Sequence, residues 1–206
     1  MANISVKQIV DPTDEELDSI VSLVVRAFDG QNVVNMFTGN NLTLAEPLWR
    51  AHVLAGLHHG EVWVATDGTA EIMSVGVWFL PGHELYGTEE LEEYFTLLSD
   101  EAINWWRNIS RPKVVGFFEK YLGEKTRTDN WFAQIIATHP DYERRGLASA
   151  HIDAVYHRAV REESYLALGA AGKAQEAFYR SNGFKELGRV SSQTADWVCF
   201  VKGKGI

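Results

Sequence analysis

Apolar and polar residues follow two different periods near the N-terminus, and the change of period predicts a strand followed by a helix. Residues 6–10 alternate with period two, which is typical of a half-buried strand. After an Asp-Pro break, apolar residues recur at helical spacing over residues 17–28, as on one face of an amphipathic helix. Thr13 and Glu16 have the spacing of a capping box, which marks the start of this helix.

The next segment predicts a loop and a second helix. Residues 31–42 carry Gly, Asn and other polar residues without a clear period, so we expect a loop there. Thr43 and Glu46 repeat the capping-box spacing. Pro47 suits the first turn of a helix that we expect to run to about His58.

A β-hairpin is expected next, because two apolar runs flank a strong turn signal. The runs are residues 62–65 and 72–79, and Asp67-Gly68 lies between them. Asp-Gly favours the turns that join hairpin strands. Pro81-Gly82 then ends the second strand of the hairpin.

A long connection, about residues 84–129, separates this hairpin from the next apolar strand. Its apolar residues, such as Leu91, Phe95 and Phe118, recur at helical spacing, so we expect two or three helices. Long connections in compact domains are usually functional or disordered, and this one is too aromatic for disorder. Two interpretations stay open: the segment is added scaffold or a homodimer surface, or it is a lid that walls a substrate pocket.

Composition narrows the class of protein. The chain has 206 residues, which suits one domain over residues 1–206. A net charge of −9 disfavours nucleic acid and anionic membranes as partners, and it suits either a cationic substrate or simple solubility. No apolar run reaches the roughly 18 residues of a membrane span, and the N-terminus lacks a signal-peptide core. With a single cysteine, Cys199, the expectation is a reducing compartment, the cytosol or the nucleus, and we take the location to be cytoplasmic.

Three patterns that resemble reactive sites are interpreted as structural. His58 and His59 are adjacent on a helix and face different directions, and no partner has metal-ligand spacing, so we predict no metal site. Residues 169–172, Gly-Ala-Ala-Gly, lack the spacing of a nucleotide-binding loop and are interpreted as a turn. Cys199 lies in an apolar run and is expected to be a buried strand residue.

The strongest chemical signal lies in residues 136–149. An apolar run ends at a Pro turn, and two arginines and a glycine then open a new amphipathic segment. A helix N-terminus presents unpaired N–H groups and a positive dipole end, so it binds phosphate. Gly146 allows the backbone to approach an anion, Ala148 is small, and Arg144 and Arg145 add positive charge.

Residues 143–148, Glu-Arg-Arg-Gly-Leu-Ala, resemble motif A of the GNAT superfamily of acetyl-CoA-dependent acyltransferases. That motif reads Gln/Arg-x-x-Gly-x-Gly/Ala and cradles the CoA pyrophosphate. Gly146 and Ala148 match it, whereas Glu143 stands at the Gln/Arg position. The resemblance implies cofactor contacts from the whole turn: Arg144, Arg145, Gly146, Leu147, Ala148 and Ser149.

Residues 174–184 resemble motif B of the same superfamily, in which a short helix ends in Tyr-x-x-x-Gly-Phe and leads into a strand. Tyr179 and Gly183 match the motif, and Asn-Gly is a typical helix end. Gly172 stands where the family usually has Asn. The resemblance implies that Tyr179 protonates the departing CoA thiolate.

The resemblance also implies the fold and the co-substrate. The GNAT fold is an α/β (α+β) fold with a mixed, twisted sheet, here of about six or seven strands with flanking helices and a helical insertion at about 84–129. It splays open between the fourth and fifth strands, here about residues 131–138 and 165–168, and acetyl-CoA lies in the split. Further cofactor contacts are implied from the fourth strand and the motif B helix: Ile136, Ala137, Thr138, Gln175 and Phe178.

The implied reaction is direct attack of a small-molecule primary amine on the acetyl thioester, which needs a base for the ammonium. Many relatives carry a Glu on the fourth strand, where this chain has Phe132 and Ala133. Removal of the proton through water is one alternative. Four side chains are the others: Glu84, Glu119, Asp129 and His139.

Two other classes of function stay open. One is a CoA-binding module that has lost catalysis and acts as a sensor or partner module, although the presence of Tyr179 argues against it. The other is an O-acyl or longer-chain acyltransferase, since Trp78, Phe79 and Trp131 could form apolar pocket walls. A panel of amine acceptors separates the first class from an enzyme, and acyl-chain preference separates the second.

Overall fold

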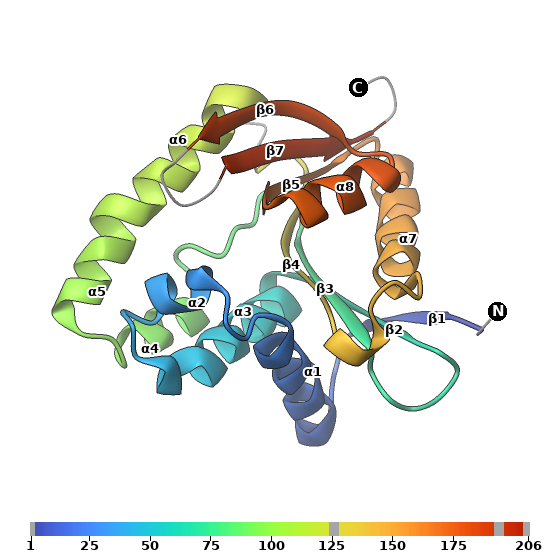
Figure 1. The fold of residues 1–206 in the computed structure, drawn as a ribbon, viewed down its shortest axis with the longest axis horizontal. Helices are drawn as coiled ribbons and strands as arrows, with labels where there is room; N and C mark the ends of the chain where they lie inside the picture. The colour runs from blue at the N-terminus through green and yellow to red at the C-terminus, as the bar shows by residue number, and fades with distance from the viewer. Residues whose placement is uncertain (1–2, 124–127, 192–195, 204–206) are drawn as a thin grey trace.

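The protein, described by a computed structural model over residues 3–123, 128–191 and 196–203, is built around a twisted seven-stranded sheet (Figure 1). The strand order is β1-β2-β3-β4-β5-β7-β6. Neighbouring strands are antiparallel except β4 and β5, which are parallel, so the predicted mixed α/β fold is confirmed. The strands are β1 (Ser5–Ile9), β2 (Gly60–Thr66), β3 (Ser74–Phe79), β4 (Trp131–Thr138), β5 (Leu166–Ala171), β6 (Lys185–Ser191) and β7 (Asp196–Lys202).

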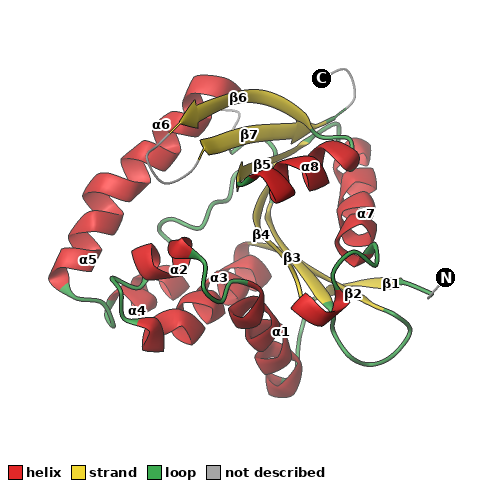
Figure 2. Cartoon of the chain, in the orientation of Figure 1, coloured by secondary structure: helices red, strands yellow, loops and turns green. Residues whose placement is uncertain are grey.

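Helices cover both faces of the sheet (Figure 2). Helices α1 (Asp14–Ala27) and α3 (Ala45–His59) pack against one face, and α7 (Leu147–Arg161) and α8 (Lys173–Ser181) pack against the other. None of the helices in the described residues combines the length and apolar character of a bilayer span. The other helical segments are α2 (Asn32–Phe37), η1 (Leu42–Leu44), α4 (Glu89–Phe95), α5 (Asp100–Trp105), η2 (Trp106–Ser110), α6 (Arg111–Leu122) and η3 (Pro140–Tyr142).

Local capping explains where the first helices begin. Glu16 N–H donates to the Thr13 hydroxyl and Thr13 N–H donates to the Glu16 carboxylate, both at 3.2 Å, so the predicted capping box of α1 is confirmed. The second predicted capping box is wrong. Thr43 lies inside η1 and donates its hydroxyl to Asn41 at 2.7 Å, and α3 begins after this turn without a side-chain cap.

The expected loop at residues 31–42 contains the short helix α2, so that prediction is wrong over Asn32–Phe37. Val34 is buried, and the ring of Phe37 lies 4.5 Å from that of Trp106, measured between centroids. A six-residue helix shows fewer than two turns of hydrophobic period. Contacts with residues far along the chain therefore decide this element, and local sequence does not reveal it.

Strand β5 is longer than predicted. Gly169 pairs with Cys199 of β7, and the strand continues to Ala171, so the expected turn at residues 169–172 is wrong apart from Gly172. A side chain at Gly169 would meet the ring of Phe118, because a Cβ there would lie 2.9 Å from that ring. The glycine allows an insertion helix to approach the sheet closely.

The predicted helical insertion between the third and fourth strands is confirmed. Helices α5, η2 and α6 follow one another without a break over residues 100–122, and η2 is a π-helical turn inside this long rod (Figure 1). Phe118 and Leu122 of α6 are buried against Ala167 and Val201, so α6 covers the β5–β7 half of the sheet. Ahead of the rod, α4 packs closely on α3.

Strand β4 contains a β-bulge at Gln134. Val77 of β3 faces Ile135, but Trp78 faces Ala133, which leaves Gln134 as an extra residue. The bulge reverses the alternation of side chains along β4. Phe132 packs on α6 before it, and Ile135 belongs to the core with α1 and α3 after it.

Candidate cofactor cleft and catalytic residues

Strands β4 and β5 separate soon after they meet. They pair only through Trp131 with Leu166 and Phe132 with Ala167, whereas β5 remains paired with β7 as far as Ala171. In the part of the chain that the structure describes, β4 from Ala133 onward therefore has no strand partner on the β5 side. The expected splay between these strands is confirmed, and it exposes an edge of main-chain polar groups that can bind a ligand.

The end of this unpaired edge leads directly into a helix N-terminus. The chain passes through η3 to Gly146, which caps α7 with a left-handed backbone (φ +86°). Ala150 N–H donates to the Gly146 carbonyl at 3.0 Å, which is the first bond of the helix. Within the described residues the N–H groups of Leu147, Ala148 and Ser149 have no hydrogen-bond partner, so they can serve an anion.

The two arginines of this turn differ. Arg145 donates to the Asp141 carbonyl at 3.0 Å, and its guanidinium lies 4.8 Å from the centre of the Tyr142 ring. Arg144 is exposed, has a positive φ of 59°, and makes no hydrogen bond or ion pair with any other described residue. Arg144 is therefore the cation available to a ligand, while Arg145 stabilises the turn itself.

A buried polar network, which sequence reasoning missed, fixes the end of β4. The Ser74 hydroxyl donates to the Ala137 carbonyl at 2.8 Å and contacts the Thr138 hydroxyl at 2.9 Å. His151 of α7 places Nε2 3.2 Å from the same Ser74 oxygen. Burial lowers the pKa of His151 to about 3, so its ring is neutral. The Thr138 side chain is thus linked through Ser74 to His151 of α7, and the main-chain groups of Thr138 on the β5 side of β4 are left for a ligand.

Helix α8 carries the tyrosine that sequence analysis singled out. The helix ends at Asn182 and Gly183, and Phe184 N–H donates back to the Tyr179 carbonyl at 3.1 Å. The ring of Tyr179 is nearly buried, with centroids 5.6 Å from Phe184 and 5.9 Å from Phe200. Burial raises the pKa of Tyr179, so the phenol stays protonated. Its hydroxyl has no hydrogen-bond partner in the described chain.

The other residues expected on α8 lie at the start and on the side of the helix. Gln175 folds back over Gly172: a Cβ at Gly172 would lie 2.6 Å from the Gln175 amide oxygen. Gly172 has a φ of +111°, so the family's usual Asn would be strained in this backbone. Phe178 is half-exposed and packs at the edge of the cluster that contains Tyr179 and Ile152 of α7. The sequence-predicted residues of α7 and α8 are thereby brought to the same face of the sheet.

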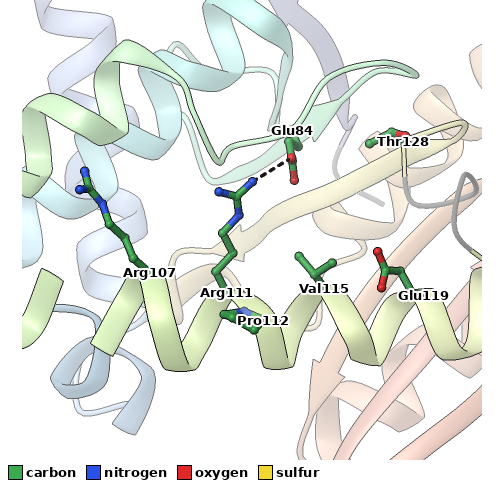
Figure 3. Close-up of a pocket in the computed structure, with 7 residues that line it drawn as sticks. All are labelled: Glu84, Arg107, Arg111, Pro112, Val115, Glu119 and Thr128. Atoms are coloured by element: carbon green, nitrogen blue, oxygen red, sulfur yellow. Dashed lines mark ion pairs between the residues drawn. The ribbon is translucent and has the colours of Figure 1, made fainter. Parts of the chain in front are cut away.

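The structure separates the four candidate bases. Glu84 and Glu119 line one pocket of about 420 Å³ between α6, the loop after β3 and Thr128 (Figure 3). Arg107 and Arg111 line the same pocket, and an Arg111 guanidinium nitrogen lies 3.7 Å from a Glu84 carboxylate oxygen. The pocket therefore offers carboxylates and guanidiniums side by side, which suits a polar ligand.

The other two candidates lie elsewhere. Asp129 is exposed just before β4. His139 lies at the other end of that strand, where its Nε2 is 3.0 Å from an Arg26 nitrogen of α1. His139 and Arg26 line a second pocket of about 610 Å³ beneath α1. The contact between His139 and Arg26 thus joins the end of β4, where the motif A turn begins, to α1.

Comparison with known proteins gives a family match for the centre of the chain and a wider likeness of fold. Residues 101–186 match the family described as acetyltransferase (GNAT) domain. No curated protein matches the chain.

Several solved structures share the fold. One, from Corynebacterium glutamicum and described as histone acetyltransferase HPA2 and related acetyltransferase, is 18% identical, with 99% of this chain and 98% of that chain covered and a TM-score of 0.67. Arylalkylamine N-acetyltransferase 2 from Aedes aegypti is 15% identical, with 97% and 98% covered and a TM-score of 0.68. An N-acetyltransferase from Staphylococcus aureus is 15% identical, with 96% and 100% covered and a TM-score of 0.62.

Proposed function

Because residues 101–186 match the GNAT acetyltransferase domain and the whole chain shares its fold with solved acetyltransferases, we propose that the protein is a GNAT acetyltransferase, which transfers an acetyl group from acetyl-CoA to the primary amine of a small-molecule acceptor. One observation carries the proposal. Strand β4 loses its partner β5 after Phe132, and its free edge leads into a helix N-terminus with unpaired N–H groups. That arrangement suits an extended ligand with a peptide-like arm and an anionic end, as CoA has.

The cofactor would lie along β4 with its pyrophosphate at the turn from Arg144 to Ser149. Main-chain groups of Ile136, Ala137 and Thr138 would pair with the amides of the pantetheine arm, as a neighbouring strand does. The free guanidinium of Arg144 supports this placement, as does the absence of a side chain at Gly146. No metal ion takes part in the proposed reaction.

In the proposed step the neutral amine nitrogen attacks the thioester carbonyl carbon, a C–N bond forms, and the C–S bond breaks. The sulfur takes the electron pair and would receive its proton from the Tyr179 hydroxyl. The amine loses its proton to the base or to water. Burial keeps the pKa of Tyr179 raised, so the phenol carries its proton through the neutral pH range.

The acceptor would bind near α6. The pocket that contains Glu84 and Glu119 adjoins Thr128, which precedes the start of β4, and the pyrophosphate turn follows the end of the same strand. A pantetheine arm that runs back along β4 would bring the thioester toward this pocket. Carboxylates there would hold a cationic amine, and N-acetyltransferase names among the similar structures support an amine as the class of acceptor.

Calorimetry and an acceptor panel test the proposal. We expect CoA to bind the purified protein with one site, and acetyl-CoA to be consumed faster when arylalkylamines, polyamines or amino acids are added. CoA binding without turnover on any amine would favour a sensor or partner module. Faster transfer from longer acyl-CoAs or to alcohols would favour the other acyltransferase class.

A further inference from the structure

We infer that Arg189 of β6 is a positioning residue, which fixes α8, and through α8 the ring of Tyr179, against β6 and β7. The inference rests on the proposed role of Tyr179. Arg189 is the centre of a cluster of five charged side chains from α8, β6 and β7. The other members of this cluster, here called the α8 clamp, are Glu176, Arg180, Glu186 and Asp196.

The Arg189 guanidinium bonds three carboxylates on three elements. It donates to Glu176 of α8 at 2.9 Å, to Glu186 of its own strand at 3.1 Å from two nitrogens, and to Asp196 at the start of β7 at 3.1 Å. Arg180 of α8 adds bonds to Glu176 at 3.0 Å and Glu186 at 2.6 Å. A rigid guanidinium fork can hold several carboxylates in fixed directions, which an ammonium cannot.

A β-bulge makes this geometry available. Glu186 faces Phe200 and Gly188 faces Cys199, which leaves Leu187 as an extra residue in β6. In a regular strand, residues three apart point to opposite faces of the sheet. The extra residue returns Glu186 and Arg189 to the same side, where they meet.

Glu176 is the member of the clamp that links Arg189 to the part of α8 that carries Tyr179. Its side chain is only 10% exposed and lies one turn before Tyr179 on α8. Arg189 is the main reason that the pKa of Glu176 is lowered. Without Arg189 this carboxylate would keep only Arg180 as a charged partner, and α8 would lose its link to β7 and keep only the Arg180–Glu186 pair to β6.

The main chain of Arg189 holds the insertion in place as well. The Tyr121 hydroxyl of α6 donates to the Arg189 carbonyl at 2.7 Å. Gly188 has no side chain to obstruct this contact, since a Cβ there would overlap the Tyr121 ring. One residue thus connects the helix beside the acceptor pocket to the helix that carries Tyr179.

The test compares Arg189→Gln with a matched control, Arg50→Gln. Arg50 also bonds two carboxylates on two helices, Asp18 and Glu46, and its side chain is 34% exposed against 33% for Arg189. We expect Arg189→Gln to lower kcat by about tenfold with acetyl-CoA KM unchanged, and Arg50→Gln to leave kcat unchanged. Arg189→Lys keeps the charge, so its kcat should lie between those of Arg189→Gln and the wild type. It replaces Arg189→Gln in the test if that variant does not fold.

A double variant and hydrogen exchange separate positioning from general stability. If Arg189 acts through Tyr179, Arg189→Gln should cause no further loss of kcat in a Tyr179→Phe background. Amides of residues 176–181 should exchange at least about tenfold faster in Arg189→Gln, with those of α7 unchanged. Unchanged exchange in α8, or an undiminished loss of kcat in the Tyr179→Phe background, would overturn the inference.

The proposed function and the acid role of Tyr179 fail in different ways. CoA binding without turnover on any amine would count against the acetyltransferase, whereas a Tyr179→Phe variant with full kcat would remove only the acid role, whatever Arg189 does to α8. Faster exchange in α8 of Arg189→Gln would then still support the clamp as the structural anchor of that helix, and the effect on catalysis would be withdrawn.

Discussion

At the residue scale, Gly146 has a positive φ that suits glycine, and it lies in the turn where we propose that the CoA pyrophosphate binds. We predict that Gly146→Asp lowers CoA affinity by more than about tenfold, because a carboxylate beside the pyrophosphate costs on the order of 1.4 kcal/mol or more. Isothermal titration calorimetry measures the change. Gly146→Asn is the matched control, since Asn tolerates a positive φ and carries no charge. Equal CoA affinities of the two variants would contradict a charge-sensitive anion site at this turn.

Tyr179 gives a second test at the same scale. We predict that Tyr179→Phe lowers kcat by about a hundredfold and leaves the KM for acetyl-CoA nearly unchanged, because the lost interaction strengthens only as sulfur gains charge. Steady-state kinetics on an amine substrate measure both constants. If Tyr179→Phe leaves kcat unchanged while Tyr179→Ala weakens acetyl-CoA binding, the ring only packs under the cofactor.

The pH dependence of this loss follows from burial. Burial raises the pKa of Tyr179 above its usual value of about 10, and the protonated phenol is the form that donates. The ratio of wild-type kcat to that of Tyr179→Phe should therefore stay constant from about pH 7 to pH 10. A ratio that falls by about half as the pH reaches 10 would indicate a tyrosine with the ordinary pKa of about 10.

At the element scale, the pocket beside α6 decides whether the insertion contributes to acceptor binding. We predict that Glu119→Gln raises the KM for a cationic amine by about tenfold, because a charge-assisted hydrogen bond contributes about 1.5 kcal/mol or more. The KM for acetyl-CoA should stay the same. Glu93→Gln, an exposed acid on α4 away from the pocket lining, is the control. Identical kinetics of both variants would indicate that the insertion is scaffold.

At the scale of the whole molecule, two buried histidines couple stability to pH. Burial lowers the pKa of His52 to about 4 and that of His151 to about 3, both below the unfolded value of about 6.5. The unfolded chain therefore binds more protons in this range, so stability is present above pH 6.5 and falls as pH decreases. Between pH 7.5 and 5 we expect a loss of about 2 kcal/mol for each histidine.

Urea denaturation at several pH values measures this loss. His52→Phe should remove about half of the slope between pH 7.5 and 5, because the remaining proton uptake belongs to His151. A slope equal to that of the wild type would show that the buried ring of His52 already titrates in the folded state.

Elements with a long period or a strong cap were predictable from local sequence. The α1 capping box, the run that forms β4 and the motif A turn all depend on neighbours within a few residues. The wrong predictions concern segments whose secondary structure depends on contacts with residues far along the chain. Thr43 became part of η1, and Gly169 became part of β5 because β7 pairs with it and Phe118 fills the space above it. Short segments have too little period of their own to oppose such contacts.

The sequence by itself determined the mixed α/β class, the helix start at Gly146 and the helix end at Gly183, since glycine conformation and periodicity act over one or two turns. Only the tertiary structure decided the rest of the candidate site. The bulge at Gln134 and the early separation of β4 from β5 depend on pairing between residues more than 30 positions apart, and the clamp around Arg189 joins three elements up to 13 positions away from it. Their geometry follows from strand pairing and packing across the whole sheet, and no local pattern contains that information.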